Sequence, residues 1–251
     1  MIQISKNKLA APVSDGRMVD CASDRLNMVE AIGLSVFRGR LPILRDINLV
    51  VPQSETVAFM GRNGAGKSTL LKCLAGVLRT HRGRVCWLGN AVARSPFVRR
   101  QIGFVGHDTG LYNELSAFEN LVFAGRLSGV DCPGERARTL LAAAGLKAVM
   151  HRPVGESSQG LRRRLAIARA LIHEPRLILL DEPFASLDAE GRYWLEQLFA
   201  SWRQVGRTVC FAGHDVEQSR ALADRILWLE MGRIVTAEVT SRPPMYSQWS
   251  A

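Results

Sequence analysis

One continuous stretch, Ser157–Asp188, constrains the fold more than any other part of this 251-residue sequence. It joins a turn of the form S-x-G, a basic helical segment, an apolar segment that ends in Asp-Glu, and an S-L-D turn. The apolar segment, Leu177–Leu180, is short and bounded by polar residues, which predicts a buried strand. A helix that leads directly into a buried strand is typical of α/β proteins with a parallel sheet.

The helical segment in this stretch has a clear apolar face. Four residues at helical spacing form that face: Leu161, Leu165, Ala168 and Ile172. The arginines at 162–164 fall between them, and an amphipathic helix usually turns its charged side chains toward solvent. We therefore expect these arginines to lie on the outside of the protein.

Strand and helix patterns alternate along much of the remaining chain. The expected strands lie at 34–52 (two strands joined by a short turn), 57–60, 84–89, 101–106, 208–214 and 225–230. Helices are expected directly after a glycine-rich loop near residue 65 and over residues 189–202. This alternation predicts an α/β fold with a mostly parallel sheet.

Residues from about 112 to 165 interrupt the alternation with helical patterns rich in Ala and Leu. Ser116 and Glu119 have the spacing of a capping box, in which each side chain satisfies a free backbone N–H at the start of a helix. The pattern breaks at 132–135, Cys-Pro-Gly-Glu. We expect a helical subdomain here, inserted between strands of the core.

The glycine-rich loop fits the phosphate-loop pattern G-x-x-x-x-G-K-[ST] in full and lies between a predicted strand and a predicted helix. Glycines let backbone N–H groups face phosphate oxygens, and the helix N-terminus adds partial positive charge. We expect Lys67 to reach the β- and γ-phosphates of ATP and the Ser68 hydroxyl to bind Mg²⁺. The other loop residues expected at the nucleotide are Gly61, Arg62, Asn63, Gly64, Ala65, Gly66 and Thr69.

Two other predicted strands end in polar side chains: Asp181 and Glu182 after one, His214 after the other. In a parallel sheet such strand ends face a site at one edge. We expect Asp181 to hold Mg²⁺ through water, and Glu182 to polarise the attacking water as a general base or an orienting acceptor. A lone histidine at a strand end is usually structural, but next to these groups we expect His214 to contact the γ-phosphate.

The chain is basic, with 33 Lys and Arg against 23 Asp and Glu and a net charge of +10. Nucleic acid, an anionic membrane surface, or an ordinary solvated surface could each explain this charge. The basic residues are spread out and have no interleaved aromatic side chains, which a nucleic-acid platform would be expected to carry. We therefore expect no nucleic-acid partner.

The N-terminal residues 1–27 are polar and non-periodic. They do not have the pattern of a signal peptide, and no apolar run in the sequence approaches the roughly 20 residues that span a bilayer. We expect a disordered extension, or an upstream start, since Met18 and Met28 also lie in frame.

The five cysteines are scattered and form no C-x-x-C pair. This pattern predicts reduced thiols rather than disulfides or a zinc site. Cys73 and Cys210 have apolar neighbours in the sequence, so we expect both in the core.

Together these motifs resemble the ATP-binding subunits of ATP-binding-cassette (ABC) transporters over residues 28–238, which leaves 239–251 as a C-terminal tail. The signature turn of that family reads L-S-x-G-Q, and here it is the segment 157–161, Ser-Ser-Gln-Gly-Leu. The resemblance implies a P-loop core with a mostly parallel sheet, an antiparallel β subdomain and a helical subdomain. It also implies ATP hydrolysis coupled to transport.

The resemblance further implies that the nucleotide is closed over by a second copy, or by a related cassette, in an ATP-dependent dimer. Ser158, Gln159 and Gly160 would then meet the γ-phosphate held by the facing subunit, where a helix N-terminus suits an anion. Asp188 would belong to a loop that crosses the dimer interface. Phe37 occupies the place of an aromatic residue that stacks on adenine, although an aromatic residue in a strand is often part of the core.

Two positions depart from the family pattern: Ser157 replaces a bulky apolar residue, and His107 replaces a glutamine that helps the metal and touches the membrane partner. Because Mg²⁺ prefers oxygen ligands, we expect His107 to act through water or only at the partner contact. The phosphate-binding Ser158 and Gly160 are in place, so we expect activity to be kept.

The segment 103–130 is similar to the haem-exporter ATPases of cytochrome c maturation, which often carry Gly-His at 106–107. That interpretation places the subunit on the cytoplasmic face of the membrane, beneath transmembrane permease subunits. Drug-type and polysaccharide-type exporter ATPases share much of this pattern and remain alternatives.

Two further hypotheses have less support. A soluble ATPase acting on nucleic acid or ribosomes would fit the charge, but such proteins usually carry two cassettes or an inserted coiled coil. A subunit that holds ATP without hydrolysing it would fit the two departures, but the intact Glu182 and His214 argue against it.

Overall fold

The computed structural model describes residues 27–88, 90, 91 and 96–240. Asn27, the last residue of the predicted extension, already belongs to the first strand, and Val239, the first of the predicted tail, ends the last one. The rest of these two predicted segments lies outside the described residues, apart from Thr240. Cys21 lies outside them as well.

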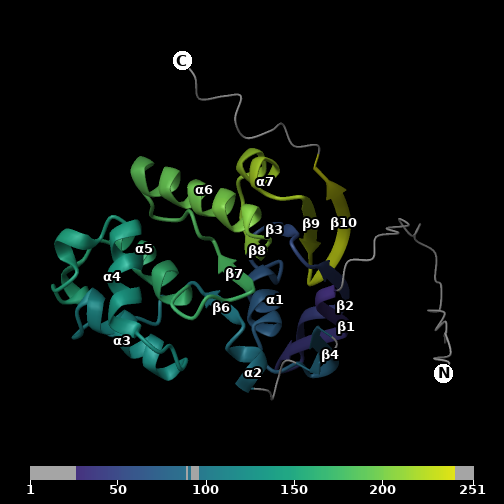
Figure 1. Ribbon diagram of the computed structural model, residues 1–251. Coiled ribbons are helices and arrows are strands. Elements are labelled where there is room, and N and C mark those ends of the chain that lie inside the picture. The colour runs from purple at the N-terminus through teal and green to yellow at the C-terminus, as the bar shows by residue number, and fades with distance from the viewer. Residues whose placement is uncertain (1–26, 89, 92–95, 241–251) are drawn as a thin grey trace, which may run out of the picture.

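A six-stranded sheet forms the centre of the molecule, in the order β10-β9-β3-β8-β7-β6 (Figure 1). Its strands are β3 (Thr56–Met60), β6 (Ile102–Val105), β7 (Leu177–Asp181), β8 (Thr208–Ala212), β9 (Arg225–Glu230) and β10 (Arg233–Val239). All neighbouring pairs are parallel except β9 and β10, which are antiparallel. Every residue of β3, β7 and β8 is buried, as expected for strands covered on both faces. The predicted mostly parallel sheet is confirmed.

A second, antiparallel sheet of four strands has the order β2-β1-β4-β5. Its strands are β1 (Asn27–Arg38), β2 (Leu41–Pro52), β4 (Arg82–Trp87) and β5 (Asn90–Ala91). Helix α1 (Lys67–Leu74) contacts β2 as well as β7 and β8, and its Leu70, Leu71 and Leu74 have no exposed surface. The main hydrophobic core therefore lies around α1, between the two sheets.

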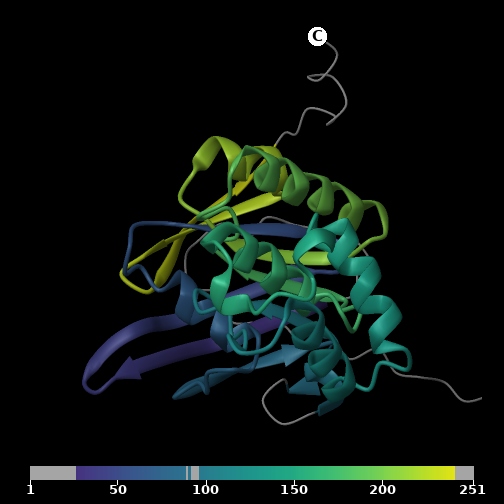
Figure 2. The ribbon, with the colours of Figure 1, turned by 90° about the vertical axis from the view of Figure 1, so that its left-hand side faces the viewer.

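The opposite face of the six-stranded sheet is covered by helices. A second core cluster joins β7 and β8 to helix α6 (Ala189–Gln204) and helix α7 (Val216–Leu222). Figure 2 shows these two helices as the top layer, above the parallel sheet, with the long β1–β2 hairpin at the bottom. A short helix, α2 (Pro96–Arg99), precedes β6.

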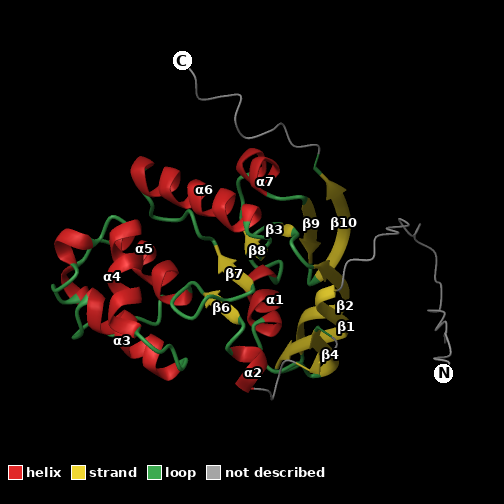
Figure 3. Cartoon of the chain, viewed as in Figure 1, coloured by secondary structure: helices red, strands yellow, loops and turns green. Residues whose placement is uncertain are grey.

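The helical part predicted near residues 112–165 consists of α3 (Ala117–Leu127), α4 (Pro133–Ala143) and α5 (Gln159–Ala170). Two short 3₁₀ turns, 147–149 and 154–156, connect α4 to α5. These helices share a third core cluster, to which Leu165, Ala168 and Ile172 contribute. Figure 3 shows the three helices together on one side, away from the antiparallel sheet.

The prediction that the arginines of α5 lie outside is wrong for two of the three. Arg163 and Arg164 are only 6% and 5% exposed as residues, and Arg162 is half-buried. The apolar face of α5 does pack inward, but the helix is enclosed on further sides. Backbone carbonyls and carboxylates lie there and accept from the guanidinium groups. Apolar periodicity cannot detect acceptors that come from other elements.

Cys73 and Cys210 lie in the core, 2% and 0% exposed, as expected. Burial raises the pKa of the Cys73 thiol to about 12 and also raises that of Cys210. Both therefore act as small apolar core residues that stay protonated at neutral pH.

The capping box predicted at the start of α3 is formed. The Ser116 hydroxyl accepts from the Glu119 backbone N–H (3.2 Å), and the Glu119 carboxylate accepts from the Ser116 N–H (2.8 Å). Hydrogen bonds from the Ser116 backbone and side chain lower the pKa of Glu119 below its ordinary value. The ionised carboxylate is thus the form that the helix start prefers.

We predict that Ser116→Ala lowers the free energy of unfolding in urea by about 1 kcal/mol, because the cap is lost.

The contribution of the Glu119 carboxylate to the free energy of unfolding should be fully present above the unfolded pKa of about 4.5, and it should disappear as the pH falls below that value. The stability difference between wild type and Glu119→Ala should therefore shrink on acidification. Glu114→Ala, an exposed neighbour outside the box, is the control; a difference that grew at low pH would contradict this assignment.

Candidate functional site

The phosphate loop has a backbone that requires glycine at two of its positions. Gly61, Gly64 and Gly66 all have positive φ, at 143°, 81° and 107°. A Cβ at Gly61 would lie 2.2 Å from the carbonyl oxygen of Leu229, and one at Gly66 would lie 2.7 Å from Leu44 Cδ2. The loop is thus held between the end of β9 and strand β2, with its backbone close to both.

The side chains that follow the loop point back into it. The Lys67 ammonium is buried and donates to the carbonyl oxygens of Gly61 (2.6 Å) and Arg62 (3.2 Å), so it arches over the loop. Arg62, Asn63 and Gly64 are exposed at the rim. Together with the N-terminus of α1, this forms a cationic cradle suited to phosphate oxygens.

Ser68 and Asp181 are brought into contact from different elements. The Ser68 hydroxyl, in the first turn of α1, donates to Asp181 Oδ1 at the end of β7 over 2.9 Å. Asp181 is 2% exposed, and its second oxygen, Oδ2, is buried without a hydrogen-bond partner among the described residues. A buried carboxylate oxygen that lacks a donor suits a cation. The hydroxyl and carboxylate oxygens also match the ligands that Mg²⁺ prefers.

Glu182, the next residue, is held in a left-handed backbone conformation with φ of 48°. This conformation costs a non-glycine residue about 1–2 kcal/mol, and such residues cluster at functional sites. Two backbone hydrogen bonds fix it: Glu182 N–H donates to the Ala212 carbonyl (3.1 Å), and the Ala185 N–H donates to the Glu182 carbonyl (3.1 Å). The side chain is directed by this turn rather than by ordinary strand geometry.

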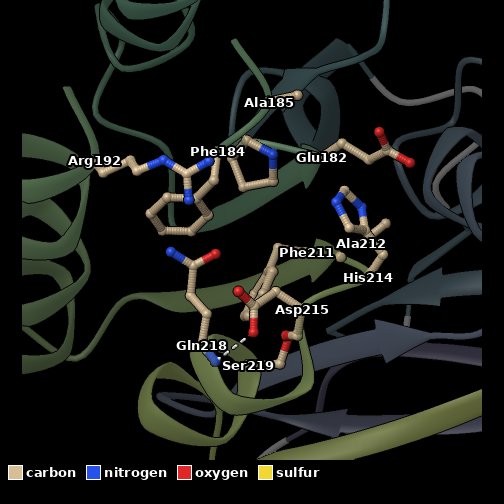
Figure 4. Close-up of a pocket in the computed structure, with 12 residues that line it drawn as sticks. Glu182, Phe184, Ala185, Arg192, Phe211, Ala212, His214, Asp215, Gln218 and Ser219 are labelled. Carbon is tan, nitrogen blue, oxygen red and sulfur yellow. Dashed lines mark hydrogen bonds between the residues drawn. The ribbon is translucent and has the colours of Figure 1, made fainter. Parts of the chain in front are cut away.

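Glu182 and His214 line one open pocket at the carboxyl ends of β7 and β8. Figure 4 shows the Glu182 carboxylate and the His214 ring on one side of this pocket, with Arg192 and Phe184 on the other. His214 is exposed, and Glu182 is half-buried. The structure therefore brings these two predicted residues together at the edge of the sheet where the phosphate loop also begins.

A second open pocket lies next to the end of β7. It is lined by both strand-end carboxylates, the predicted His107, and residues of α5 and the loop after β7: His107, Thr109, Gln159, Arg163, Asp181, Glu182, Ala185 and Ser186. The exposed His107 is thus placed beside the carboxylates.

The turn that starts α5 is an N-cap. The Ser158 hydroxyl accepts from the Leu161 N–H (3.3 Å), while Ser158 and Gln159 are both exposed. Gly160 lies against the loop after β7, since a Cβ there would be 2.9 Å from the Ser186 carbonyl oxygen. The family resemblance assigned the turn that starts α5 and the loop after β7 to a dimer interface. These two segments are therefore in contact within one chain.

Asp188 serves as the N-cap of α6, accepting from the Gly191 N–H (2.8 Å), and forms an ion pair with Arg164 (2.8 Å). The hydrogen bond from Arg164, followed by that from Gly191, lowers the pKa of Asp188. The Glu190 carboxylate forms a second ion pair with the Arg164 guanidinium, at 3.0 Å. This cluster ties the loop after β7 to α5.

Phe37, expected at adenine, is half-buried near the end of β1 and is not part of the core clusters. Its ring meets the His81 ring edge-on at 5.8 Å, and the Arg82 guanidinium lies 5.9 Å from its centroid. Its position on an aromatic and basic rim is compatible with stacking on a base.

A sequence profile described as "ABC transporter" matches residues 44–185. The chain belongs to the ABC transporter family. It is 35% identical over 196 residues to the ABC transporter ATP-binding protein NatA of Bacillus subtilis, covering 76% of this chain and 80% of NatA. It is 40% identical over 208 residues to the cobalt import ATP-binding protein CbiO of Rhodobacter capsulatus, covering 79% of this chain and 74% of CbiO.

Another relative is the cytochrome c biogenesis ATP-binding export protein CcmA of Cupriavidus necator, 40% identical over 167 residues, covering 66% of this chain and 74% of CcmA. Among solved structures, a dimeric post-hydrolysis state of the ATP-binding cassette MJ0796 with ADP and Pi superposes with a TM-score of 0.78. It has 28% identity and covers 84% of this chain and 98% of that one. The sequence-based assignment to the family is confirmed.

As an ABC cassette, the chain is an ATP-binding subunit whose ATP hydrolysis is coupled to transport. Among its described residues, no helix is both long enough and apolar enough to cross a membrane. The family motifs account for the phosphate loop, the Asp-Glu strand end and the strand-end histidine. The sequence did not reveal the contacts of Arg163 and Arg164, because their acceptors are supplied by the loops after β6 and β7.

Proposed function

We propose that two copies of this cassette, or this cassette and a related one, close over two ATP molecules. The observation that carries the proposal is the placement of the signature turn. Ser158 and Gln159 are exposed at the start of α5, whereas Lys67, Ser68 and Asp181 are assembled at α1 and the end of β7. One chain thus offers a nucleotide cradle and, on a separate element, an exposed helix N-terminus suited to an anion.

Within the cradle, the phosphate loop binds the β- and γ-phosphates through its backbone N–H groups and the Lys67 ammonium. Rim residues Arg62, Asn63 and Gly64, with Ala65, Gly66 and Thr69 behind them, complete the enclosure, and Phe37 stacks on the adenine. Glu182 accepts a proton or a hydrogen bond from the attacking water. His214 donates to the γ-phosphate from the adjacent strand end.

Mg²⁺ fits the pair Ser68 and Asp181, where a buried carboxylate oxygen has no donor in the described residues. When bound, the ion neutralises phosphate charge that develops during hydrolysis. Asp181 supplies the negative charge and Ser68 fixes its orientation through their hydrogen bond. His107 lies in the same pocket as Asp181, so it acts through water or at the contact with a membrane partner.

The closed dimer uses the exposed side of α5 and of the loop after β7. Ser158 and Gly160 contact the γ-phosphate of the facing subunit, with Gln159 beside them. Asp188, fixed by its cap and its ion pair, shapes the loop that crosses the interface. The dimeric state of the MJ0796 cassette, with its TM-score of 0.78, supports this arrangement.

We assign the transport partner to transmembrane permease subunits and the location to the cytoplasmic face of the membrane. The related cbiO1 of Clostridium perfringens, 26% identical with a TM-score of 0.72, is described as part of the transporter complex cbiONQ. No nucleic-acid partner is expected.

For the cargo, we propose haem export in cytochrome c maturation. The support is the Gly106-His107 pair with the pattern that follows it, and the 40% identity to CcmA. The relatives also include ATP-binding proteins for the import of cobalt and of sulfate or thiosulfate. Drug-type and polysaccharide-type export remain the alternatives.

We predict that Asp181→Asn weakens Mn²⁺ binding in the presence of ATP by at least about tenfold, because a charged ligand is removed. Mn²⁺ is the probe, since its free form can be counted by electron paramagnetic resonance. Asp215→Asn is the matched control: Asp215 caps α7 at a neighbouring strand end, and Asn caps equally well. Equal Mn²⁺ affinity in both variants would remove Asp181 from the metal site.

We predict that Glu182→Gln lowers kcat by at least about a hundredfold and yields an ATP-dependent dimer on size-exclusion chromatography. Binding should survive because the phosphate loop is untouched, while hydrolysis loses its carboxylate. Glu230→Gln, an exposed change at the end of β9, should stay active. If Glu182→Gln stays monomeric with ATP at high protein concentration, the two-copy arrangement is wrong.

For the cargo, we predict that cells lacking this subunit lose haem-stained c-type cytochromes, and that the wild-type chain but not Glu182→Gln restores them. Drug resistance and surface polysaccharide are measured in parallel. Normal cytochromes together with a defect in either of the other two would replace the haem assignment by the corresponding alternative.

A further inference from the structure

Arg163 is a buried cation that joins three parts of the site. Its guanidinium donates to the carbonyl oxygen of Gly106 over 2.8 Å and to the carbonyl oxygen of Asp181. These acceptors lie 57 and 18 residues away in the sequence, in the loop after β6 and at the end of β7. Arg163 itself belongs to α5, the helix that starts at Ser158.

The surroundings of Arg163 are unfavourable for a purely stabilising role. The residue is 6% exposed, its Nε has no hydrogen-bond partner among the described residues, and it forms no ion pair within that part of the chain. Burial lowers the pKa of the guanidinium, and the charges of Asp181 and Glu182 act in the opposite direction. A buried cation whose direct acceptors are neutral carbonyls is costly, and an apolar residue of similar size would often be as stable.

The carbonyl of Asp181 belongs to the peptide group that connects Asp181 to Glu182. Glu182 has the left-handed φ of 48°, a conformation that persists only where neighbouring contacts fix it. The hydrogen bonds of Glu182 with Ala212 and Ala185 fix the residue from one side. Arg163 holds the preceding peptide group from the side of α5.

We propose that Arg163 is a positioning residue for ATP hydrolysis: its guanidinium locks the peptide before Glu182, and the loop that carries His107, to the helix that begins at Ser158. The inference rests on the roles of Glu182 and Ser158 in the proposed function. Arg163 acts through the backbone that aims Glu182, because its two acceptors are the carbonyl oxygens of Gly106 and Asp181.

The same contact links the two parts of the proposed site that one chain carries: the start of α5 at Ser158 and the end of β7 before Glu182. Arg163 lies five residues after Ser158 in a continuous helix, about 7.5 Å along its axis. A shift of α5 that brings Ser158 to the facing nucleotide therefore also moves the Arg163 clamp on the peptide before Glu182. Through the hydrogen bonds of Arg163, the rate of ATP hydrolysis on one chain depends on the position of its own helix α5 against the facing subunit.

The test compares purified full-length variants in steady-state ATP hydrolysis. We expect Arg163→Met to lower kcat at least about tenfold, with KM for ATP within about threefold of wild type, because aiming of Glu182 is lost while the phosphate loop is intact. Arg163→Lys should recover part of kcat, since one ammonium cannot reproduce the two-armed guanidinium contact.

Arg207→Met is the matched control. The Arg207 guanidinium also grips two backbone carbonyls, those of Glu174 (2.7 Å) and Pro175, but at the opposite end of the sheet, before β7 and β8. We expect it to lower the melting temperature while leaving kcat of the folded protein within about twofold of wild type.

Hydrogen exchange provides a readout that does not need turnover. Amides of residues 105–109 and 181–186 should exchange at least about tenfold faster in Arg163→Met than in wild type, and at the wild-type rate in Arg207→Met. If Arg163→Met does not fold, Arg163→Lys is judged by the same two measurements.

An unchanged kcat and unchanged exchange in a folded Arg163 variant would overturn the inference. An equal loss of kcat in folded Arg207→Met would overturn it as well, because the effect would then be general destabilisation. The proposed function fails separately, if Glu182→Gln with intact Arg163 forms no ATP-dependent dimer.

Discussion

The active edge of this cassette depends on the parallel register of three strands, β3, β8 and β7. Ala212 of β8 is paired with Phe59 on one side and with Asp181 on the other. The chain therefore leaves all three strands at the same level, and backbone hydrogen bonds continue past the strand ends, from Gly213 N–H to Phe59 and from Glu182 N–H to Ala212. A register shift of one residue would turn Asp181 away from Ser68 and point an apolar side chain into the cradle.

This register places the negative charge of the Asp181 carboxylate where the protein provides few positive groups to balance it. Asp181 is buried; one carboxylate oxygen accepts a hydrogen bond from Ser68, and the other has no donor within the part of the chain that the structure describes. Arg163 donates to the backbone carbonyl of Asp181, and the Asp181 carboxylate forms no ion pair with the described residues. The site is thus arranged to be completed by a cation and a polyanion together, because either one alone would leave buried charge unbalanced.

The sequence was enough to predict the features that depend on local chemistry. The phosphate loop, the capping box at Ser116 and the fully buried strands each have a pattern within a few residues, and the structure contains them. The burial of Arg163 and Arg164 could not be predicted in this way, because their acceptors come from loops far away in the sequence. The periodicity of α5 identifies the apolar face correctly, but it assigns the remaining faces to solvent by default.

Gly160 lets the start of α5 approach the Ser186 carbonyl, because a Cβ at this position would lie only 2.9 Å from that oxygen, so the start of α5 and the loop after β7 form one continuous surface. Arg164 joins the same two parts through Asp188, and Arg163 joins α5 to the end of β7. Consecutive arginines on one helix thus have different tasks. In the proposed dimer, Arg164 fixes the surface offered to the facing subunit, and Arg163 connects that surface to the end of β7. The family resemblance predicts a bulky apolar residue at Ser157, yet the turn keeps its cap, since the Ser158 hydroxyl accepts from the Leu161 N–H.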